Sequence, residues 1–154
     1  MDRISKPIAE IMRHERPRPL PATATVDEAI ALMRQEGWTS VLVTDDDARL
    51  VGLITEYDVL MRVIAADLDP STTQLAEVMT AAPECLEPSD DVAYAINLMS
   101  TQPFRCVPVV DGQGRALSVL TCSDVMKHLA DILTEALEPP HPGDGSDWLD
   151  LGGG

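Results

Sequence analysis

Residues 52–58 read Gly-Leu-Ile-Thr-Glu-Tyr-Asp, an apolar run that ends in the pattern Thr-x-x-Asp. A similar run, residues 118–124, ends in Thr-x-x-Asp 66 positions later. The apolar, β-branched residues before each threonine predict a strand, and the apolar stretch after each aspartate predicts a helix. We therefore expect two strand-to-helix junctions, each with a threonine and an aspartate at its turn.

Further matches at this spacing extend the repeat over most of the chain. At offsets of 66 or 67 positions, three more stretches of the first copy return in the second: 8–12 as 75–79, 26–33 as 92–99, and 41–43 as 108–110. Short loop insertions explain an offset that changes by one residue. Two copies predict a duplicated domain with a pseudo-twofold axis, because a solenoid needs three or more repeats.

Each copy predicts the same series of elements, β–α–β–β–α, and the fold class is therefore α+β. A short helix and an extended, proline-containing stretch come before each series. The expected helices and strands lie at about 27–36, 40–44, 50–54 and 58–66 in the first copy, and at 91–101, 106–110, 116–120 and 124–133 in the second. Thr25 and Glu28 predict a capping box, and segments 45–48 and 111–114 predict turns between strands.

The chain divides into a first domain at 1–70, which includes the N-terminal helix, a second domain at 71–137, and a tail at 138–154. The tail combines proline, glycine and acidic residues, a composition typical of disorder. Its segment 147–151, Asp-Trp-Leu-Asp-Leu, leaves two interpretations open: an idle extension, or a docking peptide for a partner protein.

The composition limits the classes of partner. With 11 Lys and Arg against 26 Asp and Glu, the net charge of −15 disfavours polymeric nucleic acid, whose binders neutralise phosphates with basic residues. A small phosphate ligand is compatible with this charge, because salt screens charges beyond about 8 Å. No apolar run reaches the roughly 18 residues of a membrane span, and residues 1–10 lack the order of a signal peptide. Three cysteines cannot all pair, so we expect a cytoplasmic protein.

Thr-x-x-Asp at the start of a helix has two interpretations. It can be a capping box, in which the hydroxyl and the carboxylate satisfy backbone N–H groups. The same carboxylate can accept both hydroxyls of a ribose, as acidic residues do in dinucleotide folds, while the threonine hydroxyl and free helix N–H groups meet a phosphate. The two interpretations are compatible with each other.

The duplicated pattern resembles the cystathionine-β-synthase (CBS) domain family. The resemblance rests on both Thr-x-x-Asp junctions, on the Ile/Val-Met elements that end at Met12 and Met79, and on Val-Pro-Val-Val-Asp at 107–111; it covers residues 8–133. It implies two tandem CBS units that form one pseudo-twofold module and bind AMP, ADP or ATP. The ligand-binding residues carried over by the resemblance are Thr55 and Asp58 in one site, and Thr121 and Asp124 in the other.

Two differences make the copies unequal. Arg105 lies three residues before Pro108, where some nucleotide-binding members of this family place a basic residue facing the phosphates; a solvated arginine at a strand edge is the alternative. We align it with Trp38, which either stacks on a purine or packs in the core. We therefore expect the second site to bind phosphate-bearing ligands more tightly, although Ser118 there replaces Gly52 and disfavours close backbone approach of a ligand.

Further basic residues in the first copy and on the last helix have less specific interpretations. The extended stretch of the first copy is either a solvated, proline-stiffened linker or a contribution to phosphate binding across the pseudo-dyad; its basic residues are Arg13, His14, Arg16 and Arg18. Lys127 and His128 on the last helix are expected to lie in a solvated C-terminal turn.

No motif in the sequence predicts catalysis: GxSxG, P-loop, GxGxxG and HExxH patterns are all missing. Cys106 and Cys122 lack the further ligands of a metal site. We therefore expect a non-enzymatic regulatory module, without catalytic cofactor or metal, that senses an adenine nucleotide, forms a homodimer and signals to a separate effector protein. The alternative is a dimeric interaction scaffold with an empty or vestigial cleft. The faces expected to form the dimer contain Ala29, Met33, Met61, Ala65, Ala95, Met99, Met126 and Ala130.

Overall fold

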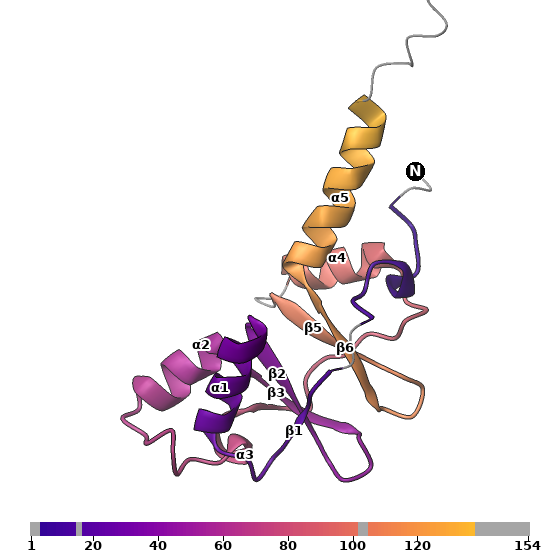
Figure 1. Ribbon diagram of the computed structural model, residues 1–154. Coiled ribbons are helices and arrows are strands. Elements are labelled where there is room, and N and C mark those ends of the chain that lie inside the picture. Colours follow the sequence, from indigo (N-terminus) through magenta and orange to yellow (C-terminus); the bar gives the residue numbers. More distant parts are fainter. Residues whose placement is uncertain (1–3, 15–16, 102–104, 138–154) are drawn as a thin grey trace, which may run out of the picture.

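The computed structural model describes residues 4–14, 17–101 and 105–137, so the predicted tail and Arg16 lie outside the described residues. The chain forms two halves that lie side by side, each with strands and helices packed together (Figure 1). The first half contains β1 (Leu20–Pro21), α1 (Val26–Glu36), β2 (Ser40–Thr44), β3 (Leu50–Thr55), α2 (Glu56–Asp58) and the π-helix η2 (Val59–Ile64). The second half contains α4 (Val92–Thr101), β5 (Cys106–Val110), β6 (Ala116–Thr121) and α5 (Cys122–Leu137). The remaining short elements are η1 (Ile8–Glu10), α3 (Leu75–Val78) and β4 (Thr80–Ala81).

The strand pairing confirms the α+β fold class and the predicted order of elements. β2 pairs antiparallel with β3, and β1 joins β2 in parallel. β5 and β6 form the matching antiparallel pair in the second half. There, a single parallel bridge between Leu86 and Val109 stands where the first half has β1, whose Leu20 pairs with Val43.

The sequence signals of α1 and of the strand connections act as predicted. Thr25 and Glu28 form the reciprocal capping box, and the helix ends at Gly37, whose φ of 69° suits glycine. In each connection an aspartate, Asp45 or Asp111, accepts the N–H groups of the residues two and four positions later at 2.8–3.0 Å. These bonds favour the charged carboxylate, and they lower the pKa of Asp111, most strongly through the Arg115 N–H group.

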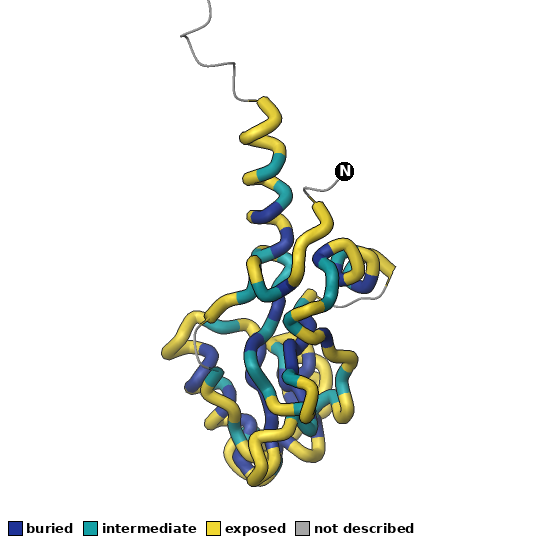
Figure 2. Tube along the Cα trace, turned by 90° about the vertical axis from the view of Figure 1, so that its right-hand side faces the viewer, coloured by how far each residue is buried: buried dark blue, intermediate teal, exposed yellow. Residues whose placement is uncertain are grey.

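The two closing helices differ more than the repeat predicts. The first is a short α-helical turn followed by η2, in which the Ala65 N–H donates to the Leu60 carbonyl five residues earlier at 2.9 Å. The second, α5, is a regular helix of 16 residues. Figure 2 shows α5 leaving the body of the molecule; none of its residues after His128 is buried.

The short helices cross between the halves. Ile8, in η1, packs with Leu86 and Leu120 in the core of the second half. Leu75, in α3, packs with Val26 and other residues of the first half. In Figure 1 the indigo N-terminal segment accordingly lies beside α4, and α3 lies beside α1. The domain boundary near residue 70 stays a prediction. The core of the second half includes a segment from before this boundary, and the core of the first half includes a segment from after it.

Candidate functional site

The first Thr-x-x-Asp lies where β3 ends and α2 begins. The Asp58 Oδ2 atom accepts the Thr55 N–H and the Thr55 hydroxyl at 2.9 and 3.0 Å, while the Asp58 N–H donates to Thr55 Oγ1 at 3.2 Å. The Asp58 side chain is only 6% exposed. The capping interpretation is therefore confirmed here, and it engages one of the two carboxylate oxygens.

The second Thr-x-x-Asp has the same geometry at the junction of β6 and α5. Asp124 Oδ2 accepts the Thr121 N–H and hydroxyl at 2.9 and 2.8 Å, and the Asp124 N–H donates to Thr121 Oγ1 at 3.2 Å. The Asp124 side chain is 11% exposed. In both copies the aspartate is held in one orientation, with Oδ1 left for another partner.

An arginine approaches Oδ1 in each copy, but it comes from a different part of the chain. Arg62, one helical turn after Asp58, places Nε 3.6 Å from Asp58 Oδ1. Arg13, in the N-terminal extended stretch, donates from Nε to Asp124 Oδ1 at 3.1 Å. The two interpretations of the basic stretch, a solvated linker or a contribution to phosphate binding across the pseudo-dyad, both stay predictions. Among the described residues of that stretch, Arg13 is the one whose side chain contacts the second junction.

The residue at position 118 has a structural role in this arrangement. The buried Ser118 hydroxyl donates to the Arg13 carbonyl at 3.0 Å, which fixes the N-terminal stretch against β6. Gly52, its counterpart in β3, faces Met79, and a Cβ there would lie 2.3 Å from Met79 Sδ. The first copy therefore needs glycine for packing, while the second uses a serine to hold the backbone of Arg13.

The structure places Arg105 just before β5 and leaves it exposed. Its carbonyl accepts the Cys122 N–H at 2.9 Å, and in the first copy the Thr39 carbonyl accepts the Glu56 N–H at 3.0 Å. The alignment of Arg105 with Trp38 is therefore wrong by one residue, because the offset of 66 holds here and pairs Arg105 with Thr39. Trp38 packs against the first core, as the second of its two interpretations proposed.

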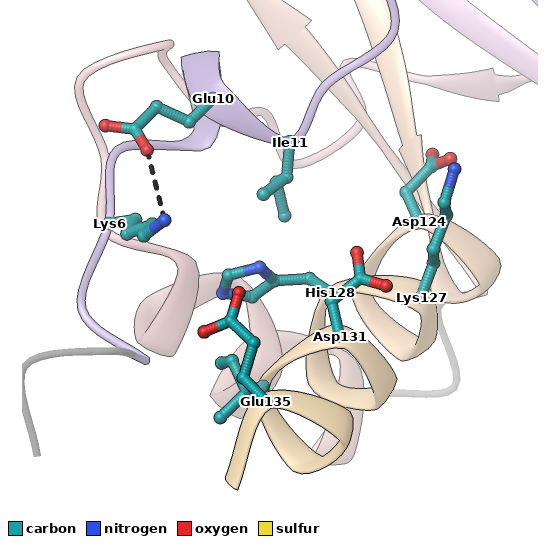
Figure 3. Close-up of a pocket in the computed structure, with 9 residues that line it drawn as sticks. Lys6, Glu10, Ile11, Asp124, Lys127, His128, Asp131 and Glu135 are labelled. Carbon is teal, nitrogen blue, oxygen red and sulfur yellow. Dashed lines mark ion pairs between the residues drawn. The ribbon is translucent and has the colours of Figure 1, made fainter. Parts of the chain in front are cut away.

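A cleft of about 370 Å³ separates the N-terminal segment from α5 (Figure 3). Lys6, Glu10 and Ile11 line one side, and one face of α5 lines the other with Asp124, Lys127, His128, Asp131, Ile132 and Glu135. His128 is 9% exposed, and its Nε2 atom has no hydrogen-bond partner among the described residues. The expected solvated position of His128 is wrong, because α5 continues to Leu137 and His128 shares its buried face with Val125.

None of the three cysteines lines this cleft. No disulfide joins Cys85, Cys106 and Cys122, and within the described ranges no group of His, Cys, Asp or Glu is suited to hold a metal ion. Burial raises the pKa of the Cys106 thiol. In the described part of the chain, no helix is both long and apolar enough to cross a membrane.

Comparison with protein families gives a match to the CBS domain twice, over residues 8–65 and 75–131. The meiotically up-regulated gene 70 protein of Schizosaccharomyces pombe is 36% identical over 114 residues, which make up 74% of this chain and 15% of that protein. Two further curated relatives are matched over 54% and 18% of their lengths, so this chain corresponds to only part of each of these proteins.

Solved structures share the fold of both halves. A CBS-domain protein of Burkholderia ambifaria is 27% identical with a TM-score of 0.75, and the match covers 82% of this chain and 95% of that one. CBSX2 of Arabidopsis thaliana, solved in complex with AMP, is 24% identical with a TM-score of 0.70, over 82% of this chain and 98% of that one. Since the family match covers both repeats and the fold is shared along the pair, the chain belongs to the CBS-domain family, as a tandem pair.

Proposed function

We propose that this CBS pair is a non-catalytic regulatory module that binds an adenine nucleotide, AMP, ADP or ATP, and signals to a separate partner protein. Each ligand lies at a strand-to-helix junction, one at Thr55 and Asp58, the other at Thr121 and Asp124. The observation that carries the proposal is the presence of two matching junctions, each with a nearly buried carboxylate held by its threonine. The AMP complex of the similarly folded CBSX2 supports an adenosine-type ligand.

The geometry suits recognition of a ribose. A carboxylate is an acceptor with two oxygens, and a ribose diol offers two O–H donors. Because the threonine bonds fix the rotamer of each aspartate, the diol meets a pre-oriented acceptor and little side-chain entropy is lost on binding. At the second junction, Arg105 and the positive end of the α5 helix dipole supply positive charge for the phosphates. We therefore expect the second site to bind phosphate-bearing ligands more tightly than the first.

A thermal-shift screen with AMP, ATP, NADH and S-adenosylmethionine tests the proposal. A ligand that binds only the folded chain stabilises it by about 2.7 kcal/mol at a hundredfold excess over Kd. AMP or ATP should raise the Tm, with guanine and pyrimidine nucleotides as controls for charge alone. If none of the adenine compounds changes the Tm, the result would instead support the interaction scaffold with an empty cleft.

The exposed helix faces support a homodimer. Tyr57, Leu60, Met61 and Ile64 are each 48–67% exposed on α2 and η2, and Met126 is 63% exposed on α5. Of the residues expected at this contact, Met61, Ala65, Met126 and Ala130 are exposed and Met99 is half-buried, whereas Ala29, Met33 and Ala95 are buried in the cores and are therefore unavailable. Contiguous exposed apolar faces of this kind are typical of interaction surfaces.

We predict a dimer of the 16.7 kDa chain at micromolar concentration, measured by sedimentation velocity. Leu60→Glu should shift the protein toward monomer, because dimerisation would bury the added charge. Gln113→Glu, which adds the same charge in an exposed turn, is the control and should stay dimeric. A monomer over the whole micromolar range, or equal effects of the two variants, would contradict the prediction.

A further inference from the structure

The Asp124 carboxylate has little remaining acceptor capacity. Its two oxygens offer about four lone-pair sites in total. The Thr121 N–H and hydroxyl occupy two at Oδ2, and Arg13 Nε occupies one at Oδ1. One site is left, whereas a ribose diol brings two donors. A ligand that bonds Asp124 through both hydroxyls therefore has to displace one of these donors. The Thr121 groups belong to the cap of α5, whereas the Arg13 side chain is 52% exposed, so the Arg13 guanidinium is the donor that can leave.

The first junction differs in this respect. The Asp58 carboxylate accepts two bonds from Thr55, and Arg62 Nε lies 3.6 Å away, beyond a normal hydrogen bond. Arg62 is held elsewhere, since its Nη1 donates to the carbonyls of Val78 and Met79 at 3.2 and 3.1 Å. The first carboxylate thus keeps room for a diol, and its arginine is fixed at the end of α3.

Position 128 explains why the second junction recruits a distant arginine. His128 lies 66 positions after Arg62 and four after Asp124, so it is the counterpart of Arg62. Its Nε2 is buried without a partner among the described residues, and Figure 3 shows its ring between Ile11 and Glu135, while Asp124 lies apart. Arg13 takes the place beside Asp124 instead. Its side chain is 52% exposed, and within the described residues Asp124 is its one hydrogen-bonded side-chain partner.

We propose that Arg13 is the specificity-determining residue of the second site and selects adenine ligands that carry a 5′-phosphate. This inference rests on the proposed function. The ribose diol displaces the guanidinium from Asp124, and the phosphate of the same ligand then receives it. Guanidinium and phosphate match in charge and in bidentate geometry, so the new contact compensates for the one that is lost. When a nucleoside without phosphate binds, Arg13 loses its contact with Asp124 and gains no new anionic partner.

Charge favours this exchange. A phosphate placed beside Asp124 would meet a carboxylate of the same sign in a poorly hydrated site, on a chain whose net charge is −15. Arg13 is the cation that contacts Asp124 in the structure, and a short movement of its long, half-exposed side chain keeps it near both anions. Arg62 cannot move in this way without giving up its two carbonyl partners, so the first site lacks the same preference for phosphate.

Calorimetry with AMP and adenosine tests the inference. The titrations use an Asp58→Ala background, so that only the second site reports. Arg13→Gln should weaken AMP by about 10- to 100-fold, the effect of losing charged hydrogen bonds. Adenosine should bind Arg13→Gln as well as, or better than, it binds the parent, because its competitor for Asp124 is gone. Arg13→Lys, which keeps the charge, should retain part of the preference for AMP, and Arg34→Gln on the exposed face of α1 should retain all of it.

The outcomes separate this inference from the proposed function. A loss of AMP affinity on Arg13→Gln that exceeds any loss of adenosine affinity supports the inference, and a larger loss for adenosine contradicts it. If Arg13→Gln weakened AMP and adenosine equally, Arg13 would only hold the N-terminal stretch in place. If it changed neither affinity, Arg13 would not contact the phosphate. Either result overturns the inference but is compatible with nucleotide binding. If the wild-type chain bound neither AMP nor adenosine, the proposed function would fall, and this inference with it.

Discussion

Replacing Asp124 by alanine is expected to weaken adenine ribonucleotides by about 10- to 100-fold, because hydrogen bonds to a charged group contribute about 1.5–3 kcal/mol each. The loss should depend on the ribose hydroxyls. A 2′,3′-dideoxy nucleotide should bind the wild-type chain weakly and lose little more on Asp124→Ala. Calorimetry of both ligands with both proteins closes a double-mutant cycle, and its coupling energy measures the contact between the carboxylate and the diol.

The capping role of Asp124 predicts a different result. Loss of a cap lowers the free energy of unfolding by about 0.5–2 kcal/mol and affects ribo- and dideoxy ligands alike. A coupling energy near zero would therefore mean that Asp124 only caps α5. Asp124→Asn keeps an acceptor for the Thr121 N–H and removes the charge, so it shows the binding effect with a smaller change in stability.

Asp58→Ala is the matched change at the first junction, and it tests the ranking of the two sites. We expect it to leave the tighter binding of phosphate-bearing ligand in place, since that binding belongs to the second site. If Asp58→Ala removed all binding while Asp124→Ala preserved it, the proposed asymmetry would be wrong.

Ile8→Ala is expected to lower the free energy of unfolding by about 2–5 kcal/mol, the range for a buried Ile or Leu truncated to alanine. Ile8 is fully buried, and it belongs to the core of the second half although it lies at the start of the first repeat. Urea unfolding gives the stability change. Hydrogen exchange should show the loss of protection in β5 and β6 before β2 and β3.

Ile4→Ala is the control for this variant. Ile4 is the same residue type four positions earlier, and it is 41% exposed, so its truncation should change stability by less than about 0.5 kcal/mol. Equal effects of Ile4→Ala and Ile8→Ala, or a loss of protection confined to the first half, would contradict the packing of η1 against the second core.

The sequence predicts the elements of this fold well because their signals are local. The Thr25 capping box, the aspartates of the strand connections and the apolar, β-branched runs of the strands each act within a few residues. The π-helical η2 is not predicted, since a single widened turn leaves the apolar pattern of a short helix almost unchanged. Likewise, the repeat predicts closing helices of equal length in the two copies, and it gives no signal that α5 extends to Leu137.

The candidate site is predicted only in part, for the same reason. Both Thr-x-x-Asp patterns identify their junctions, because each cap closes over three residues. The contact between Arg13 and Asp124 spans 111 positions and depends on the path of the N-terminal stretch across the second half. A comparison of position 128 with Arg62 is the one sequence signal that could have indicated it, since histidine there removes the local arginine.

The crossing of the short helices has a consequence for synthesis on the ribosome. Ile8 is synthesised before Leu120 and Val125, which pack with it in the same core and follow more than a hundred residues later. Because the ribosome adds roughly 5–20 residues per second, the segment that contains Ile8 remains without its packing partners for several seconds. The first half likewise waits for Leu75 and Val78 before its own core closes. Arg13 reaches Asp124 only after α5 has begun to form, so the second site needs two segments whose synthesis is separated by 111 residues.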